Sequence, residues 1–230
     1  GKPVVLVISA GSALDLSWAD AHVAAIIDSF YPGARGGKAV AEAIFGDFSP
    51  SGKLPVTFYQ GTENLPEFTD YDMSDRTYRY TDKNVLYPFG YGLHYGTIRY
   101  ENAQISCAQC SVRDAVDVSV DVINESSYTI HESVQAYIQH EEADAYEPGY
   151  QLKGIQTVTL QPKETKRVTI SLKARDFAII TQEGECVVRP GSYRIAIGGQ
   201  QPDARSAKLT GSDVAALVVR REGAQTPVEY

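Results

Sequence analysis

Apolar and polar residues alternate in the second half of this 230-residue chain. The alternation covers four short segments, at residues 116–122, 134–139, 168–172 and 193–197. Turn-forming pairs such as Pro148-Gly149 and Pro190-Gly191 lie between them. A period of two places every second side chain on one face of a strand, and short strands between frequent turns are typical of antiparallel sheets. The pattern therefore predicts an antiparallel β-sandwich.

This predicted sandwich occupies residues 97–230, a length typical of an all-β immunoglobulin-like domain. True immunoglobulin domains carry a Cys…Trp…Cys pattern. The one tryptophan of this sequence, Trp18, lies far upstream of the sandwich. The domain is therefore better described as fibronectin type III-like.

The first region has a different pattern. Val4 to Ser9 form a continuous apolar run rich in β-branched residues, which predicts a strand buried on both faces, as in parallel sheets. Residues 23–27 fit either a strand or a helix. Residues 38–45 have the apolar spacing of a helix, and Gly46 fits its C-cap. This order predicts part of an α/β domain over residues 1–60, and we expect further chain before residue 1, because such a strand needs neighbours on both sides.

A segment rich in proline, glycine and tyrosine follows. The prolines between Pro50 and Pro88 forbid long regular elements, while the many aromatic residues require a surface to pack on. We therefore predict an ordered, extended interdomain connection over residues 61–96.

The charge balance excludes several classes of partner. The chain has 29 acidic and 21 basic residues, for a net charge of -8. Such a charge disfavours nucleic acids and anionic membrane surfaces. No apolar run reaches the roughly 20 residues that span a bilayer. We therefore expect neither nucleic acid nor membrane as a partner.

The three cysteines, Cys107, Cys110 and Cys186, are few and odd in number. Cys107 and Cys110 form a CxxC without a second pair or nearby histidines, so we interpret them as incidental thiols rather than a zinc or redox site. This usage slightly favours the cytoplasm over a secreted location, although the sequence leaves the location open.

Two groups of loop carboxylates are candidates for acid–base chemistry: Asp70, Asp72 and Asp75, and Glu141, Glu142 and Asp144. Charge runs in loops usually face water, so we interpret both groups as solvated. The four histidines are scattered, and no G-x-S-x-G elbow is present. The sequence therefore predicts no catalytic residue and no metal site. Gly33 and Gly36-Gly37 indicate a tight turn before a helix rather than a phosphate cradle.

Three motifs in series resemble the C-terminal part of glycoside hydrolase family 3, the β-glucosidase and β-xylosidase family. They are Tyr31-Pro32-Gly33 with Gly36-Gly37; Phe45-Gly46-Asp47-Phe48-Ser49-Pro50-Ser51-Gly52-Lys53-Leu54-Pro55-Val56-Thr57; and Arg76-Thr77-Tyr78-Arg79-Tyr80 leading into Tyr87-Pro88-Phe89-Gly90-Tyr91-Gly92-Leu93. One departure is His94, where the family usually has serine.

The resemblance implies a fold and a function. Family members usually carry a (β/α)8 barrel with the nucleophile, then an α/β sandwich domain with the acid/base glutamate, then a fibronectin-like domain. Neither catalytic position occurs in this chain, which resembles the second half of the α/β sandwich domain followed by the fibronectin-like domain. The implied activity is that of a retaining, exo-acting β-glycosidase, which needs no cofactor and hydrolyses non-reducing terminal β-glucosides or β-xylosides by double displacement.

Two partners follow from this resemblance. One is a polypeptide that carries the (β/α)8 barrel and the first half of the α/β domain. The other is the substrate, a β-linked oligosaccharide or glycoside. We expect the chain to be inactive alone.

The best candidates for sugar contacts are Arg76, Tyr78, Arg79 and Tyr80, because aromatic faces and guanidinium groups suit sugar rings and hydroxyls. Their alternative role is structural, wedging the two domains together. The alternative function for the whole chain is a non-catalytic, fibronectin-like binding or scaffold module.

Overall fold

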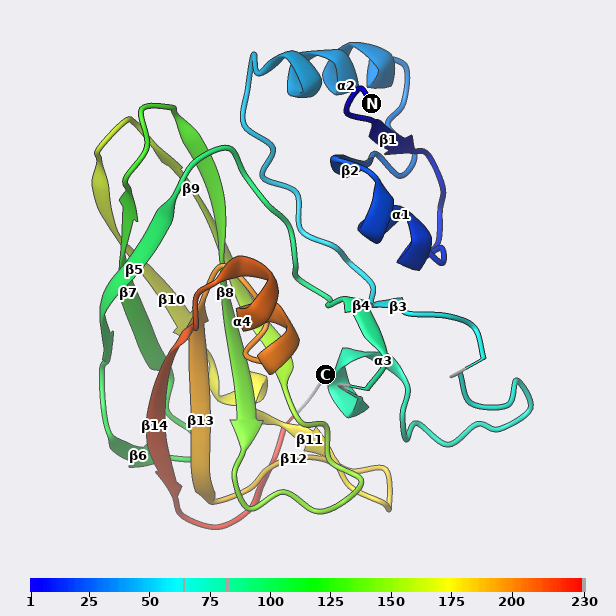
Figure 1. The fold of residues 1–230 in the computed structure, drawn as a ribbon. Helices are drawn as coiled ribbons and strands as arrows, with labels where there is room; N and C mark the ends of the chain where they lie inside the picture. Colours follow the sequence, from blue (N-terminus) through cyan, green and yellow to red (C-terminus); the bar gives the residue numbers. More distant parts are fainter. Residues whose placement is uncertain (64, 82, 229–230) are drawn as a thin grey trace.

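Two packed sheets form the second half of the chain in the computed structural model, which describes residues 1–63, 65–81 and 83–228 (Figure 1). One sheet has the strand order β6-β14-β13-β8-β9 and the other β10-β7-β5. Neighbouring strands are antiparallel except β6 and β14, which run parallel. The strands are β5 (Ile98–Ile105), β6 (Gln109–Ser111), β7 (Val116–Asn124), β8 (Ile130–His140), β9 (Gln151–Leu160), β10 (Thr165–Leu172), β13 (Gly191–Gly198) and β14 (Ala215–Glu222).

The alternating pattern builds the core between these sheets. Val116, Val118, Val120 and Val122 of β7 are all fully buried, while the polar residues between them face outward or are half-buried. They pack against apolar residues of β8, β10 and β13 in one continuous cluster. The predicted all-β fibronectin-like fold is confirmed.

Shorter elements accompany the two large sheets. A small sheet has the order β11-β12-β15, formed by β11 (Ile179–Ile180), β12 (Cys186–Val188) and β15 (Thr226–Pro227), next to the 3-10 turn η1 (Ala174–Phe177). Helix α4 (Ala204–Thr210) follows β13; the Asp203 side chain caps its start and Gly211, with a φ of 72°, ends it. The alternating pattern gave no sign of this helix.

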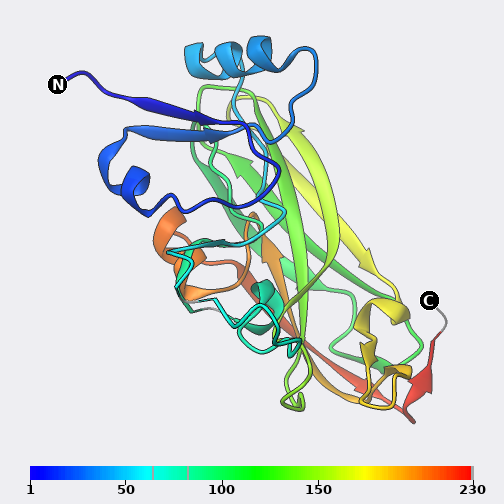
Figure 2. The same ribbon diagram turned by 90° about the vertical axis from the view of Figure 1, so that its right-hand side faces the viewer.

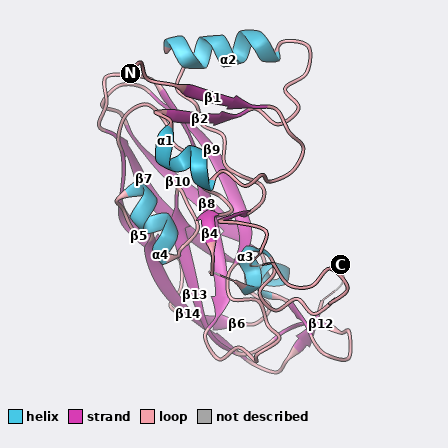
Figure 3. Cartoon of the chain, turned by 45° about the vertical axis from the view of Figure 1, so that its right-hand side comes forward, coloured by secondary structure: helices cyan, strands magenta, loops and turns pink. Residues whose placement is uncertain are grey.

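The first region forms the predicted α/β unit. Strand β1 (Val5–Ile8) pairs in parallel with β2 (Ala25–Asp28), and helix α1 (Ser17–His22) connects them in sequence. The apolar segment that fitted either structure is thus a strand. Helix α2 (Gly36–Phe45) ends where predicted, at Gly46 in the left-handed conformation. The helices lie outside the sandwich (Figure 3), and no helix of the described residues is both long and apolar enough to cross a membrane.

The expectation that the first strand is buried on both faces is wrong for the chain as described. Val4, Val5 and Val7 expose 56%, 42% and 41% of their surface, and within β1 only Ile8 is buried. Strand β2 pairs with one edge of β1, and the described residues place no strand along the other edge. The apolar run therefore presents an open edge and a bare face.

The connecting segment is ordered by packing rather than by long elements. Strand β3 (Phe58–Tyr59) pairs with β4 (Val85–Tyr87), and the short helix α3 (Thr77–Tyr80) lies between them in sequence. Phe58 and Leu86 are buried with Ile8 and Leu16 in a second apolar cluster. The α/β unit thus lies at one end of the sandwich, and the small β11-β12-β15 sheet lies at the other (Figure 2).

Adjacent valines of β14 test the sandwich core. Val219 is fully buried, whereas Val218 is 49% exposed. We predict that Val219→Ala lowers the free energy of unfolding by about 2 kcal/mol, because it removes apolar burial and leaves a cavity. The matched Val218→Ala should change it by less than about 0.5 kcal/mol. Chemical denaturation measures both, and equal effects would contradict the assigned register.

Candidate functional site

Of the four residues predicted to contact sugar, three lie in helix α3 and Arg76 is its N-cap. The four side chains have different contacts. Arg76 precedes the helix and holds the loop before it. Its guanidinium donates hydrogen bonds to the backbone carbonyls of Glu67, Asp70 and Asp72, at 2.9, 2.7 and 3.1 Å. Through these three bonds the Arg76 side chain holds the loop that precedes helix α3.

Tyr78 joins the connection to the sandwich. Its ring stacks on Phe89 with centroids 4.0 Å apart and meets the edge of Tyr137 of β8 at 6.3 Å. Its hydroxyl accepts a hydrogen bond of 3.1 Å from the backbone N–H of Leu152 in β9. The ring and the hydroxyl of Tyr78 thus both contact other parts of the protein. These contacts favour the structural role, in which this tyrosine wedges the two domains together.

Arg79 and Tyr80 line a cavity of about 490 Å³ between the connection and the sandwich. Arg79 donates a 2.6 Å hydrogen bond to the Gln151 side chain, and its backbone carbonyl accepts one of 2.7 Å from Gly149. These contacts fix the position of the helix over the cavity. Of the four predicted residues, the structure brings these two together at an open site.

A buried charged cluster lies at the other junction of the two units. The Glu132 side chain on β8 is 1% exposed, with Lys53 Nζ at 3.1 Å and His94 Nε2 at 3.6 Å from its carboxylate oxygens. These residues and Tyr100 line a second cavity of about 190 Å³. Burial, reinforced by the Glu132 charge, raises the pKa of Tyr100 well above its usual value.

Sequence reasoning missed this cluster. Its one signal is the position of Glu132 on β8, which shares the inward parity of Ile130, Val134 and Ala136. A carboxylate at an apolar position needs a charged partner. Lys53 is 79 positions upstream, so the pattern alone did not name it.

The loop carboxylates considered for catalysis are engaged elsewhere. Asp144 pairs with Arg189 at 2.6 Å, and hydrogen bonds from Arg189 and Tyr146 lower its pKa. Hydrogen bonds from Ser74 lower the pKa of Asp72. A general acid needs the opposite shift.

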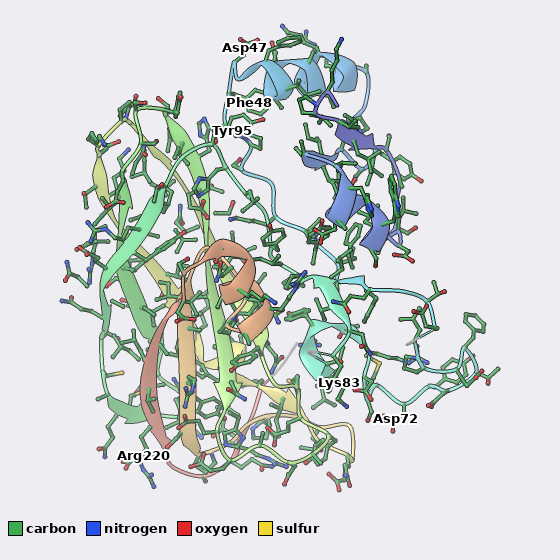
Figure 4. All side chains as sticks on the ribbon, in the orientation of Figure 1. Asp47, Phe48, Asp72, Lys83, Tyr95 and Arg220 are labelled. Carbon is green, nitrogen blue, oxygen red and sulfur yellow. The ribbon has the colours of Figure 1, made fainter. Side chains whose placement is uncertain are left out.

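The remaining members of those two groups are also in contact with other residues. Glu141 pairs with Arg194 at 3.0 Å and Asp75 with Lys83 at 3.1 Å. Glu142 accepts a hydrogen bond from the backbone N–H of Ser192, and Asp70 accepts one of 2.9 Å from the backbone N–H of Asp72. Asp72 and Lys83, both labelled in Figure 4, are exposed residues of the connection. None of these contacts forms a catalytic pair.

The cysteines are free thiols. Burial raises the pKa of Cys110 to about 11, so the thiol is protonated and unreactive at neutral pH. Among the described residues, no group of three or more His, Cys, Asp or Glu side chains is arranged to hold a metal ion.

Comparison with known families places both regions. The model of the glycosyl hydrolase family 3 C-terminal domain matches residues 1–95, and that of the fibronectin type III-like domain matches residues 132–201. Taken in series, the two matches make the chain similar to glycosyl hydrolase family 3. It corresponds to the C-terminal region of the family's members.

Relatives agree with this assignment. The chain is 34% identical to a β-xylosidase of Formosa agariphila, 35% to a xylan 1,4-β-xylosidase of Xylanibacter ruminicola and 33% to a periplasmic β-glucosidase of Salmonella typhimurium. These matches cover 91%, 91% and 86% of the chain, but only 30%, 24% and 28% of the relatives. The chain thus spans less than a third of their length.

A solved structure is similar throughout. The β-glucosidase from Listeria innocua in complex with glucose superposes with a TM-score of 0.81 at 27% identity. The superposition covers 97% of this chain and 31% of that one. The arrangement of the two units is therefore shared with that β-glucosidase.

The buried cluster predicts a pH dependence of stability. Burial lowers the pKa of His94 below its ordinary value of 6.5, and the neighbouring Lys53 adds to this, although Glu132 opposes it. The unfolded chain then binds more protons than the folded chain as the pH falls through about 6.5, so the free energy of unfolding decreases with acidification.

We predict that His94→Ser makes this decrease shallower between about pH 7 and pH 5. The exposed His131 on β8 provides the control, and His131→Ser should leave the slope unchanged. Denaturation at a series of pH values measures both slopes. An unchanged slope in His94→Ser would contradict the claim that the lowered pKa of His94 causes the pH dependence.

Proposed function

We propose that this chain is part of a retaining, exo-acting β-glycosidase that hydrolyses non-reducing terminal β-glucosides or β-xylosides. The two family models matched in series are the observation that carries this proposal. The relatives' names, β-xylosidase and β-glucosidase, supply the substrate class. The reaction would proceed by double displacement through a covalent glycosyl-enzyme, which needs no cofactor.

The catalytic carboxylates of the proposed enzyme lie outside this chain. A retaining glycosidase needs two carboxyl groups roughly 5–5.5 Å apart, one of them an acid with a raised pKa. The pKa values of Asp72 and Asp144 are instead lowered. The buried Glu132 and Glu147 are held by Lys53 and by Arg189 and His140, at distances of 2.8 to 3.1 Å.

The companion in this proposal is a polypeptide segment that carries the (β/α)8 barrel and the first half of the α/β domain. The bare face of β1 supports this role. Val5 and Val7 are more than 40% exposed, and Trp18 in the neighbouring α1 is 70% exposed. An unpaired strand edge beside exposed apolar residues is the surface that another strand and its covering elements would bury.

Arg79 and Tyr80 remain the proposed sugar contacts on this chain, because they line an open cavity. We assign Arg76 and Tyr78 to positioning this segment. Helix α3 would thereby combine both roles considered for it.

The proposal predicts that the 230-residue chain alone does not hydrolyse an aryl β-glucoside or an aryl β-xyloside. Co-expression with the barrel-bearing segment of the same protein should yield hydrolysis of at least one of them, since that segment supplies the catalytic carboxylates. Release of the chromophore measures the rate. Hydrolysis by the isolated chain at a rate near that of an intact family member would contradict the proposal.

The alternative, a non-catalytic binding or scaffold module, is favoured by one observation. The main apolar cluster is built wholly from residues of the sandwich, so this domain has its own core. If it is a binding module, sugar binding should survive removal of residues 1–95. Loss of binding by a truncated chain that circular dichroism shows to be folded would contradict the binding-module alternative.

A further inference from the structure

The larger cavity combines an unusual charge with a polar wall. It lies between helix α3, the loop after β8, strand β9, turn η1 and the small β11-β12-β15 sheet. Three cationic residues line it, Arg79, Lys153 and Arg175, and Asp176 is the one carboxylate among the described lining residues. The chain as a whole carries a net charge of -8. A site with excess positive charge in such a chain points to an anionic occupant.

The cations are poorly neutralised by the protein. Burial lowers the pKa of Lys153, and the positive charge of Arg79 lowers it further. The Nε of Arg79 is buried and has no hydrogen-bond partner among the described residues, although Nη2 reaches Gln151. Within the described residues, no carboxylate lies within ion-pair distance of any of the three. Arg79 and Lys153 are half-buried, whereas Arg175 is exposed. A half-buried charge without a counter-ion is costly, so an anion bound beside Arg79 and Lys153 would stabilise the site.

Asp176 does not neutralise them. Its Oδ2 accepts a hydrogen bond of 2.7 Å from the backbone N–H of Lys173, where it caps turn η1. Its charge raises the pKa of Lys153 only as a lesser effect. The carboxylate thus shapes the wall and leaves net positive charge in the cavity.

The rest of the wall suits a ring-shaped ligand. Tyr80, Tyr146, Pro148 and Ile179 also line the cavity. The Tyr146 hydroxyl is held by Asp144 at 3.0 Å and Arg189 at 2.8 Å, so its ring has a fixed position. Fixed aromatic rings beside guanidinium groups match the apolar faces and polar edges of a sugar. The cavity volume of about 490 Å³ lies within the range of small-molecule sites.

We propose that this cavity binds a saccharide that carries a carboxylate group, such as a uronic acid. Its carboxylate lies among Arg79, Lys153 and Arg175, and its ring lies against Tyr80 and Tyr146. The choice of a saccharide rests on the proposed glycosidase function, whereas the need for an anion rests on the cavity alone.

Calorimetric titration of the 230-residue chain tests this directly, with sodium glucuronate, glucose and sodium acetate as probes at equal ionic strength. We expect glucuronate to bind at least about tenfold more tightly than glucose, because only glucuronate offers a charged acceptor. It should also bind more tightly than acetate, which lacks the ring. Added sodium chloride should weaken glucuronate binding, since it screens the cations.

Single-charge variants then locate the site. Lys153→Gln and Arg175→Gln should each weaken glucuronate binding about tenfold. Lys153→Arg, which keeps the charge, should retain most of the affinity. Lys38→Gln is the control, because this substitution also removes one positive charge. Lys38 is exposed on α2, at the opposite end of the molecule from the cavity. Thermal melts followed by circular dichroism establish that each variant is folded.

Several results would overturn the assignment. Equal affinity for glucuronate and glucose would remove the anion requirement, and equal affinity for glucuronate and acetate would remove the saccharide. Unchanged binding in both folded Gln variants would move the site elsewhere, and so would an equal loss in Lys38→Gln. Absence of glucuronate binding would also overturn it. Because these titrations need no hydrolysis, a failure here is distinct from a failure of the proposed glycosidase function.

Discussion

The buried ion pair between Glu132 and Lys53 is the constraint on which the arrangement of the two units depends. Glu132 lies on an inward position of β8, and Lys53 lies in the α/β unit, after helix α2. A carboxylate that is 1% exposed is tolerated only with its partner in place, and loss of one partner of such a pair typically costs about 3–5 kcal/mol. The sandwich therefore reaches its folded state most favourably when the α/β unit is docked against it, and His94 of the connection completes the same contact.

The same docking creates the surface on which function is proposed. Gln135 of β8 donates hydrogen bonds to the carbonyls of Gly90 in the connection and Gly199 in the sandwich. The hydroxyl of Tyr95, which Figure 4 labels, donates to the carbonyl of Ala43 in α2. Stacking of Tyr78 then fixes helix α3. Arg79 and Tyr80 are held over the cavity as a consequence, so the proposed ligand site and the domain junction are parts of one packed structure.

The sequence pattern predicted those elements whose structure depends on neighbouring residues in the chain. The alternation at Val116 to Val122 identified β7, and Gly46 ended α2 as its position required. The family motifs identified the α/β unit, whose burial the pattern misjudged, because exposure of Val5 depends on which neighbours are present. The sugar contacts stay a prediction: the residue types around α3 indicated them, but separating Arg76 from Arg79 requires knowing which carbonyls and which cavity each side chain meets. The cations contributed by Lys153 and Arg175 come from distant strands and turns, and no sequence spacing brings them together.

Native mass spectrometry of the protein isolated from its natural source tests the central claim most directly, namely that these two units work as part of a larger family 3 glycosidase. The account predicts a mass well above that of the 230-residue chain, with the barrel-bearing segment present either in the same polypeptide or as a tightly bound second one. A folded monomer with the mass of the 230-residue chain alone would contradict it, because the bare face of β1 would then have no partner to cover it.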